Sequence, residues 1–253
     1  MNFTSTRQNT QTRVMVCDTH GPFPSRQFFE GSVWSKCPDC NHKDDPLKRN
    51  DAAAIWQRKI ENAGIPKRFE NRSLSNYVAS SDAQARALDF AREYADTFNT
   101  VLTTGRSALF IGRPGTGKTH LAIAIALHIM QCDNRTVLYT TVLRAIRKIK
   151  DTWCRNSDVT ESHAIASLVL PDLLILDEVG VQHGTETERL ILFDVLNERY
   201  EQRKPAVLLS NLPLDEMKDY LGERIYDRLR EDGGEALPFD WESFRGQQFT
   251  EKG

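Results

Sequence analysis

The stretch Gly112-Arg-Pro-Gly-Thr-Gly-Lys-Thr119 decides the fold of this chain. It directly follows the apolar run Ser107–Ile111 and directly precedes the apolar run Leu121–Leu127, which gives the order strand, phosphate loop, helix. Its three glycines allow backbone angles that other residues avoid, so that successive N–H groups can converge on nucleotide phosphates. The pattern predicts a nucleotide-binding P-loop, and a glycine turn without a ligand is the alternative.

A second stretch, Pro171–Glu178, is nearly all apolar and ends in two acids, which is typical of a strand buried on both faces. We expect Asp177 at the carboxyl end of this strand, beside the loop, where it can hold the Mg²⁺ shell. Glu178 is then placed to orient or deprotonate the attacking water. Because the two acids follow the loop by about 60 residues, they favour ATP hydrolysis over nucleotide binding alone.

The residues of the loop have separate expected roles. Lys118 supplies a positive charge to the β and γ phosphates, and Thr119 offers its hydroxyl to Mg²⁺. The helix that begins there adds the positive end of its dipole. Thr119 and Asp177 are thus the expected magnesium ligands. The full set of expected nucleotide-binding residues is Gly112, Arg113, Pro114, Gly115, Thr116, Gly117, Lys118, Thr119 and Asp177.

From about residue 105 onward the chain alternates strand and helix patterns. A capping box of Thr185 and Glu188 opens a helix that runs to about Arg203, and Gly222 can end a helix that begins near Asp215. The alternation predicts an α/β fold with a parallel sheet and helices on both of its faces. The expected strands are Ser107–Ile111, Thr136–Thr140, Asp172–Asp177, Ala206–Ser210 and Ala236–Phe239.

The first 45 residues contain two pairs of metal-ligand residues, Cys17 with His20 and Cys37 with Cys40, each with a two-residue gap. Two such pairs can complete a tetrahedral Zn²⁺ site. A segment of this length cannot build an adequate apolar core, so a structural zinc ion would stabilise it. Two alternatives stay open: the two cysteines of the second pair form a thiol redox pair, or His20 is an ordinary turn residue and His42 replaces it as ligand.

The composition is that of a soluble, intracellular protein. Of the 253 residues 40% are hydrophobic, and the formal net charge is −2, so any nucleic-acid surface has to be local. The N-terminal sequence lacks the apolar core of a signal peptide, and no stretch approaches the roughly 18 to 20 apolar residues of a membrane span. We therefore expect a cytoplasmic protein with one sizeable core and a small appendage.

One local cationic segment, Arg144–Arg155, carries five basic residues and a single acid and includes Trp153. Cations that follow a phosphate backbone, with an aromatic ring on which a base can stack, are typical of single-strand binding. The alternative is an amphipathic helix whose Trp153 packs into the core with Ile146 and Ile149. The expected DNA contacts are Arg147, Lys148, Lys150 and Trp153.

Six motifs spread over about residues 60 to 245 resemble DnaC-type replicative helicase loaders and their relatives, the IstB-like transposition helper ATPases, which are AAA+ proteins. The region before them differs from that of the DnaC-type loaders and is similar to the zinc-bearing N-terminal regions of DnaI-like and phage loaders. The motifs are Ala63–Phe69, Gly112–His120, Lys148–Trp153, Leu176–Gln182, Leu209–Leu212 and Leu221–Leu229.

The resemblance implies a five-stranded sheet without a C-terminal lid domain, bound ATP and Mg²⁺, and assembly into an open ring or spiral. It implies that Asn211 is the polar sensor of the γ-phosphate and that Arg228 is the arginine finger offered to a neighbour's ATP, with Arg224 as an alternative finger or a partner to it. In the resembled loaders the segment that matches Lys150 and Trp153 contacts single-stranded DNA. Without the resemblance, the two arginines would belong to a solvated helix face with Asp227 and Glu231.

The expected organisation is a zinc-binding region at residues 1–45, a helical linker and pre-ATPase segment at 46–104, and an AAA+ ATPase domain at 105–253. The expected function is ATP-dependent loading of a replicative DNA helicase, with Lys118, Glu178, Asn211 and Arg228 as catalytic residues. The implied partners are the helicase, gripped by the N-terminal region, single-stranded DNA and further copies of the chain. Two alternatives stay open: a transposition helper that binds duplex DNA and a transposase, and a zinc-ribbon DNA-binding scaffold whose nucleotide site is a switch.

Overall fold

The computed structural model describes residues 11–18, 21–27, 34–35, 37, 46–180 and 185–244, which belong to two compact units, Met1–Arg58 and Lys59–Gly253. The first unit contains an antiparallel hairpin of β1 (Gln11–Cys17) and β2 (Gly21–Gln27). Ser25 donates a hydrogen bond of 2.6 Å to the carbonyl oxygen of Ser35, and the guanidinium of Arg13 lies 4.1 Å from the centre of the Trp34 ring. The chain after the hairpin therefore packs back onto it. The helix α2 (Pro46–Asn62) crosses the division between the units.

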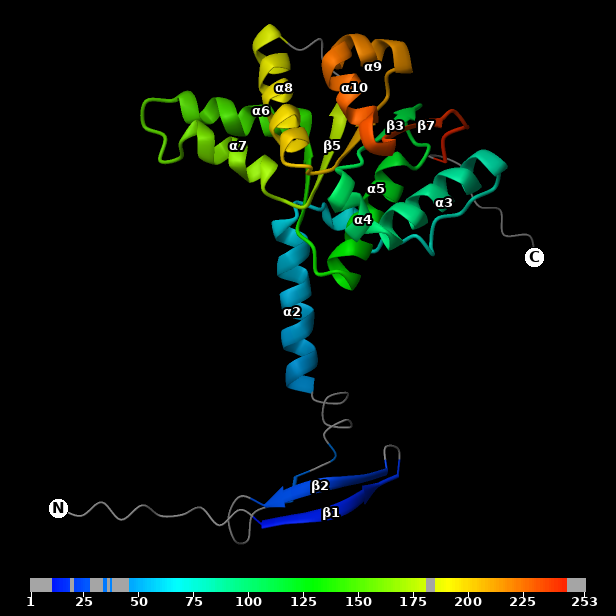
Figure 1. Ribbon diagram of the computed structural model, residues 1–253, viewed down its shortest axis with the longest axis vertical. Coiled ribbons are helices and arrows are strands. Elements are labelled where there is room, and N and C mark those ends of the chain that lie inside the picture. Colours follow the sequence, from blue (N-terminus) through cyan, green and yellow to red (C-terminus); the bar gives the residue numbers. More distant parts are fainter. Residues whose placement is uncertain are drawn as a thin grey trace, which may run out of the picture. The chain divides into compact units, whose positions relative to one another are not determined.

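The second unit is built on a five-stranded sheet with the strand order β4-β5-β6-β3-β7, labelled in part in Figure 1. All of its strand pairs are parallel, as the alternation of patterns predicts. The strand ends differ from the expected ones by no more than two residues. The strands are β3 (Ala108–Gly112), β4 (Val137–Thr141), β5 (Leu173–Val179), β6 (Ala206–Ser210) and β7 (Glu235–Phe239).

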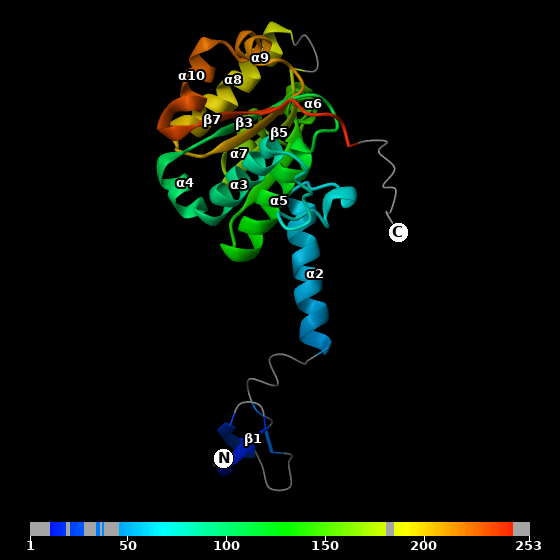
Figure 2. The same ribbon diagram turned by 90° about the vertical axis from the view of Figure 1, so that its right-hand side faces the viewer.

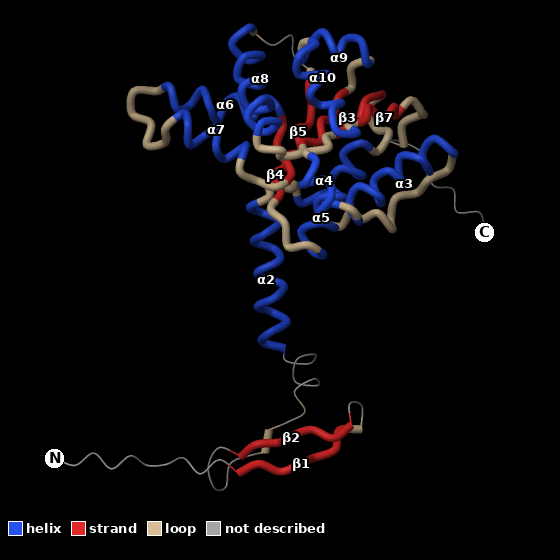
Figure 3. Tube along the Cα trace, in the orientation of Figure 1, coloured by secondary structure: helices blue, strands red, loops and turns tan. Residues whose placement is uncertain are grey.

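Helices cover both faces of this sheet, which lies between two helical layers in Figure 2 and is red among blue helices in Figure 3. The capping box of Thr185 and Glu188 opens its helix as predicted. One layer contains α3 (Asp82–Asp96), α4 (Phe98–Thr104) and α5 (Lys118–Cys132). The other contains α6 (Val142–Lys150), α7 (Glu161–Val169), α8 (Glu186–Glu201), α9 (Leu214–Leu221) and α10 (Glu223–Arg230).

Alternating strand residues supply the two apolar cores. Leu109, Leu174 and Leu208 pack in one cluster with residues of α6 to α10. On the other face Phe110 contacts Phe239, with the ring centres 5.2 Å apart. Among the described residues, no helix is long and apolar enough to cross a membrane.

A buried arginine fixes the amino-terminal ends of two strands. The side chain of Arg199 in α8 is 1% exposed, and its two terminal nitrogens donate hydrogen bonds of 2.6 to 3.4 Å to five backbone carbonyls. Burial lowers the pKa of this guanidinium, and the nearby Asp172 carboxylate opposes the shift. One cation therefore satisfies the end of α7 and the starts of β5 and β6. The acceptors are the carbonyl oxygens of Leu168, Val169, Pro171, Asp172 and Pro205.

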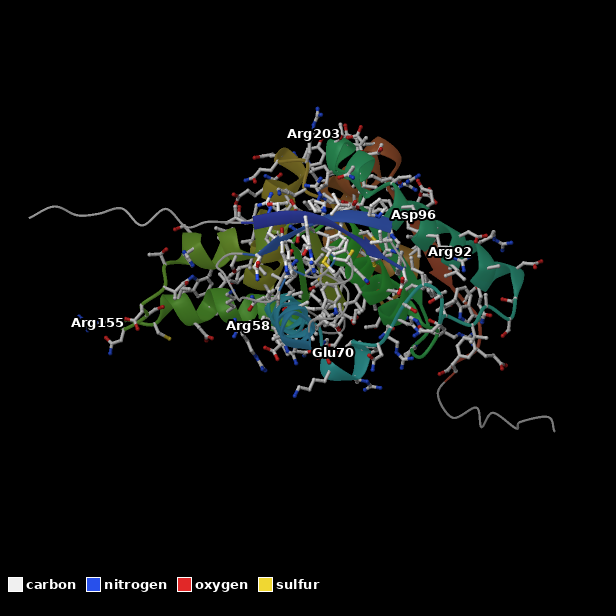
Figure 4. All side chains as sticks on the ribbon, turned by 90° about the horizontal axis from the view of Figure 1, so that it is seen from below. Arg58, Glu70, Arg92, Asp96, Arg155 and Arg203 are labelled. Carbon is white, nitrogen blue, oxygen red and sulfur yellow. The ribbon has the colours of Figure 1, made fainter. Side chains whose placement is uncertain are left out.

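Arg199→Ala should lower the free energy of unfolding by about 3 to 5 kcal/mol, because it leaves a cavity and removes the donor of five backbone carbonyls, three of them in buried hydrogen bonds. Urea denaturation measures this loss. The matched control is Arg92→Ala: Arg92 is exposed in Figure 4 and lies 3.6 Å from Asp89, a surface pair whose removal should change stability by less than about 0.5 kcal/mol. Equal losses in the two variants would contradict the structural role of Arg199.

Candidate nucleotide site

The P-loop connects β3 to α5 and is packed too closely for side chains at two of its glycines. Gly112 and Gly117 have φ angles of 147° and 97°, which favour glycine. A Cβ atom at Gly112 would lie 2.1 Å from the carbonyl oxygen of Phe239 in β7, and one at Gly117 would lie 2.8 Å from the ring of Tyr77. The shape of the loop therefore depends on the strand and the segment that flank it.

Lys118 is the first residue of α5, and its side chain is 7% exposed. Its Nζ donates hydrogen bonds of 2.6 Å and 2.7 Å to the carbonyl oxygens of Gly112 and Arg113. Thr116 is fully buried and donates a hydrogen bond of 2.8 Å to the same carbonyl of Arg113. A cation and the amino-terminal end of a helix thus lie at one loop, an arrangement that suits a polyphosphate.

The Asp177 carboxylate lies beside the loop and receives three hydrogen bonds. Thr119 and Tyr139 donate through their hydroxyls to its Oδ2 at 3.0 Å and 2.8 Å, and the backbone N–H of Glu178 donates to its Oδ1 at 2.8 Å. Burial and the negative charges of Asp177 and Glu178 raise the pKa of Tyr139, so its phenol is a neutral donor at physiological pH. The carboxylate is therefore held in one orientation next to the threonine expected to bind Mg²⁺.

Glu178 has an unusual backbone conformation. Its φ angle is 61°, in the left-handed region, and the pairing of β5 with β6 shifts register between Leu176 and Val179. An irregularity of this kind re-aims the side chains around it. The Glu178 side chain is exposed, whereas the residues before Asp177 in β5 are buried. Backbone strain thus coincides with the expected water-activating residue.

Asn211 follows β6 and is exposed. Because β6 lies between β5 and β3, the carboxyl ends of the three parallel strands bring Asn211, Glu178 and the P-loop to one edge of the sheet. The hydroxyl of Ser210 donates a hydrogen bond of 2.7 Å to the carbonyl oxygen of Val179, which fastens the end of β6 to that of β5. The expected sensor and the expected acids therefore leave adjacent, tied strands.

Sequence reasoning missed the segment after β7, which holds the loop from outside. The indole N–H of Trp241 donates a hydrogen bond of 2.9 Å to the carbonyl oxygen of Thr116, and the backbone N–H of Phe244 donates one of 3.0 Å to that of Gly115. The ring of Trp241 packs against Phe239, with the centres 4.8 Å apart. The three aromatic residues at and after the last strand, Phe239, Trp241 and Phe244, were the feature of the sequence that could have indicated this contact.

A second missed segment precedes α3. The Nε2 of His120 lies 2.9 Å from the Oδ1 of Asn76, and its ring meets the ring of Tyr77 edge to face at 5.2 Å. Burial raises the pKa of Tyr77 to about 12 and lowers the pKa of His120, so both are neutral at physiological pH. The Tyr77 hydroxyl is buried, faces Gly117 and has no hydrogen-bond partner among the described residues.

The two arginines of α10 have different environments. The guanidinium of Arg228 lies 4.7 Å from the centre of the Tyr200 ring, and its Nη1 is buried without a hydrogen-bond partner in the described part of the chain. Arg224 is exposed, with its guanidinium 5.9 Å from the Phe193 ring. Within residues 185–244 neither arginine forms an ion pair with Asp227 or Glu231, the acids of the alternative solvated helix face.

The cationic segment forms α6 and the loop that leads to α7. Helix α6 buries Ile146 and Ile149, as the amphipathic alternative predicts, and exposes Arg147 and Lys148. Trp153, however, is 50% exposed and does not join them in the core. Figure 4 shows Arg155 pointing outward at the far end of this connection.

Lys150 differs from the other cations of α6. Its Nζ donates a hydrogen bond of 2.7 Å to Glu188 at the start of α8, and this contact lowers the pKa of the Glu188 carboxyl. The exposed cations near Trp153 are therefore Arg147, Lys148 and Arg155, while Lys150 joins two helices.

Only half of the expected zinc ligands fall on described residues. Cys17 ends β1 and is half-buried, and Cys37 is buried. His20, Cys40 and the alternative ligand His42 lie outside the described residues. Within the described part of the chain, no group of three or more histidine, cysteine, aspartate or glutamate residues is arranged to hold a metal ion.

Comparison with known proteins gives consistent matches. The family model for IstB-like ATP binding protein matches residues 68–251. The replicative helicase loader DnaC of Escherichia coli (strain K12) is 35% identical over 201 residues, which are 79% of this chain and 80% of the relative. A second protein of that strain, the uncharacterized protein YdaV, is 32% identical over 230 residues, or 91% of this chain and 90% of the relative. The crystal structure of the DnaC helicase loader has a similar fold, with a TM-score of 0.62 at 24% identity over 68% of this chain and 99% of that one.

Trp241→Phe should weaken ADP binding by about threefold to tenfold, because it keeps an aromatic ring on Phe239 but removes the hydrogen bond to Thr116, and such bonds are worth about 0.5 to 1.5 kcal/mol. Titration with a fluorescent ADP analogue measures the change. Trp153→Phe, at an exposed tryptophan outside the loop, is the matched control and should bind ADP as the wild type does. Unchanged affinity in Trp241→Phe would show that the segment after β7 does not support the loop.

Proposed function

Because this chain belongs to the family of IstB-like ATP-binding proteins, an AAA+ family that includes DnaC, we propose that it is an ATP-dependent loader of a replicative DNA helicase in DNA replication. The observation that carries the proposal is the 35% identity to the helicase loader DnaC over about four fifths of both chains. The parallel sheet with its P-loop supports the nucleotide part of the proposal. The loader acts in the cytoplasm.

The residues present fit ATP with Mg²⁺, because a buried cation, a helix amino-terminus and a fixed carboxylate meet at one glycine-rich loop. The buried Tyr77 hydroxyl beside Gly117 is a further polar group that a bound nucleotide can satisfy. When bound, Mg²⁺ neutralises the phosphate charge and orients the phosphates. Lys118 would bind the β and γ phosphates, and Thr119 and Asp177 would hold the ion. The remaining loop residues from Gly112 to Gly117 would donate backbone N–H groups, except Pro114, which has none and would only shape the loop.

For hydrolysis we propose that Glu178 orients or deprotonates the attacking water and that Asn211 is the sensor of the γ-phosphate. Glu178 is an exposed carboxylate one residue beyond Asp177, so it can accept a proton from a water without contacting the metal. Asn211 leaves the neighbouring strand at the same edge and is free of the core. This division lets one side chain act on the nucleophile and the other respond to the phosphate that is removed.

Assembly would complete the site. Arg228 is the proposed finger, since its buried Nη1 lacks a hydrogen-bond partner among the described residues and its guanidinium lies over the Tyr200 ring. Arg224 lies one helical turn before it and is the alternative. A finger supplied by a neighbouring copy can raise the rate by roughly 10³ or more, which would make hydrolysis depend on an open ring or spiral of ATP-bound copies.

Single-stranded DNA would bind along α6. The exposure of Trp153 favours this role, because an indole outside the core is available for stacking. Arg147 and Lys148 are exposed cations for the phosphates, and Lys150 positions the segment through Glu188 as well as adding charge.

The helicase would be gripped by the zinc-binding region at 1–45, followed by the linker and pre-ATPase segment at 46–104 and the ATPase domain at 105–253. Cys17 and Cys37 are the described members of the proposed zinc set with His20 and Cys40. The buried position of Cys37 supports a structural rather than a catalytic ion, since such sites are closed to solvent.

Lys118→Ala should abolish ATP binding, whereas Glu178→Gln should keep ATP binding and stop turnover. Both variants should fail to load the replicative helicase of the same organism onto circular single-stranded DNA, because loading requires the ATP cycle. Nucleotide binding, phosphate release and helicase retained on the circle are measured on the same preparations.

The control is Lys218→Ala, which removes a surface lysine of α9 and should leave all three measurements unchanged. Tight ATP binding by Lys118→Ala or undiminished turnover by Glu178→Gln would contradict the nucleotide assignments. ATP turnover by the wild type without any helicase loading, together with a preference for duplex DNA, would favour the transposition alternative.

Trp153→Ala should weaken binding of an oligo-dT strand by about 1 to 3 kcal/mol through the loss of one stacked base. Lys148→Ala should reduce the slope of log affinity against log salt by about 0.7, the effect of one phosphate contact with a single strand. Fluorescence anisotropy at several NaCl concentrations measures both, with Lys218→Ala as the matched lysine control. Wild-type affinity and salt slope in both variants would move the DNA site away from α6.

A further inference from the structure

Tyr139 joins two parts of the second unit, one through its main chain and the other through its side chain. Its backbone N–H donates a hydrogen bond of 2.7 Å to the carbonyl oxygen of Ala63, directly after α2. Its hydroxyl donates one of 2.8 Å to the Oδ2 of Asp177. Figure 3 shows β4 beside the end of α2 that leads into this contact. A single residue therefore touches both the linker and the nucleotide site.

The strand β4 is at the edge of the sheet, so the outward N–H and C=O of Tyr139 have no strand partner. Ala63 and Gly64 contact them instead. Gly64 occupies the space against that C=O: its φ is 71°, and a Cβ atom there would lie 2.5 Å from the carbonyl oxygen of Tyr139. Ala63 and Gly64 thus close the edge of β4 at one residue. A displacement of these two residues has to move Tyr139 or break its hydrogen bond.

The side-chain contact completes the set of donors to Asp177. The Oδ2 of Asp177 accepts hydrogen bonds from Thr119 and Tyr139, and its Oδ1 accepts one from the N–H of Glu178. Tyr139 is 6% exposed, so its phenol cannot turn to solvent and its hydroxyl stays with the carboxylate. Without this donor, Thr119 alone would hold Oδ2, and the carboxylate would keep two of its three hydrogen bonds.

We propose that Tyr139 is a positioning residue for the magnesium site, which sets the Asp177 carboxylate and passes displacements of Ala63–Gly64 to it. The inference rests on the proposed function in one respect, namely that Asp177 faces the metal ion of a bound nucleotide. Partners that orient a metal-binding group typically change metal affinity by 10- to 100-fold when they are removed. The linker that follows the first unit would then tune metal binding without contacting the nucleotide.

Tyr139→Phe should weaken Mn²⁺ binding to the ADP-bound protein by about tenfold, measured by electron paramagnetic resonance, and should leave ADP affinity without metal unchanged. The matched control is Tyr94→Phe, which removes another buried tyrosine hydroxyl that donates at 2.8 Å, in this case to the carbonyl oxygen of Arg106. Both variants should lower the melting temperature to a similar extent, but only Tyr139→Phe should change Mn²⁺ affinity. Equal Mn²⁺ affinities in the two variants would overturn the proposal.

Asp177→Ala separates this inference from the proposed function. A large loss of Mn²⁺ affinity in Asp177→Ala with none in Tyr139→Phe would reject the role of Tyr139 and leave the magnesium site in place. Wild-type Mn²⁺ affinity in Asp177→Ala would reject the magnesium site itself, and the inference with it.

Gly64→Ala tests the connection to the linker. This substitution should reduce Mn²⁺ affinity several-fold, because the new Cβ atom displaces Tyr139. In the Tyr139→Phe background it should cause no further loss of Mn²⁺ affinity. Gly222→Ala is the matched control, because Gly222 has a similar φ of 78° with open space around its Cβ position. Gly64→Asn, whose residue type tolerates positive φ, is the second variant if Gly64→Ala does not fold. Wild-type Mn²⁺ affinity in the folded variant would overturn the connection.

Discussion

The hydrogen bonds to the Asp177 carboxylate are the interaction on which the site depends, because they join three elements that are distant in the sequence. Thr119 lies in the first turn of α5, Tyr139 lies in β4, and Glu178 follows Asp177 in β5. A buried or half-buried carboxylate without such donors would carry a large desolvation cost. Sheet order, loop and helix must therefore all be in place before this carboxylate is satisfied. The nucleotide site and the folded state therefore both depend on the hydrogen bonds to Asp177.

The strand that carries Asp177 has a regular, fixed start and an irregular end. At its start, Arg199 supplies five hydrogen bonds to backbone carbonyls around β5 and β6. At its end, the left-handed Glu178 and the register shift interrupt regular pairing. A non-glycine residue in this conformation costs on the order of 1 kcal/mol or more, and persists only where its surroundings determine it. The strand β5 is thus held firmly at its start and is irregular at its end, where Asp177 and Glu178 lie.

The sequence predicted those features that depend on local patterns. The P-loop between two apolar runs, the five strands and the capping box of Thr185 and Glu188 are signals within a few residues of each other, and the structure has all of them. The contacts of Trp241, Phe244 and Tyr77 with the loop were missed because they join residues up to about 130 positions apart, which no periodicity encodes. Helical spacing alone is also misleading at Trp153. The alternative that packs it into the core with Ile146 and Ile149 is wrong for Trp153, because the helix α6 ends at Lys150 and the register of the buried face stops before it.

The position of Arg228 bears on how assembly and turnover would be linked. Its guanidinium rests on Tyr200, an interaction worth about 0.5 to 2 kcal/mol, and one of its nitrogens lacks a hydrogen-bond partner among the described residues. A finger that accelerates hydrolysis by roughly 10³ gives about 4 kcal/mol of transition-state stabilisation, which exceeds the cost of leaving the ring. Leaving Tyr200 for a neighbour's ATP would therefore still lower the barrier by about 2 kcal/mol or more, whereas an isolated copy offers Arg228 no such partner. Contact with Tyr200 would keep Arg228 away from ATP, so hydrolysis would stay low until copies assemble. The bound nucleotide would then depend on whether the copies are assembled.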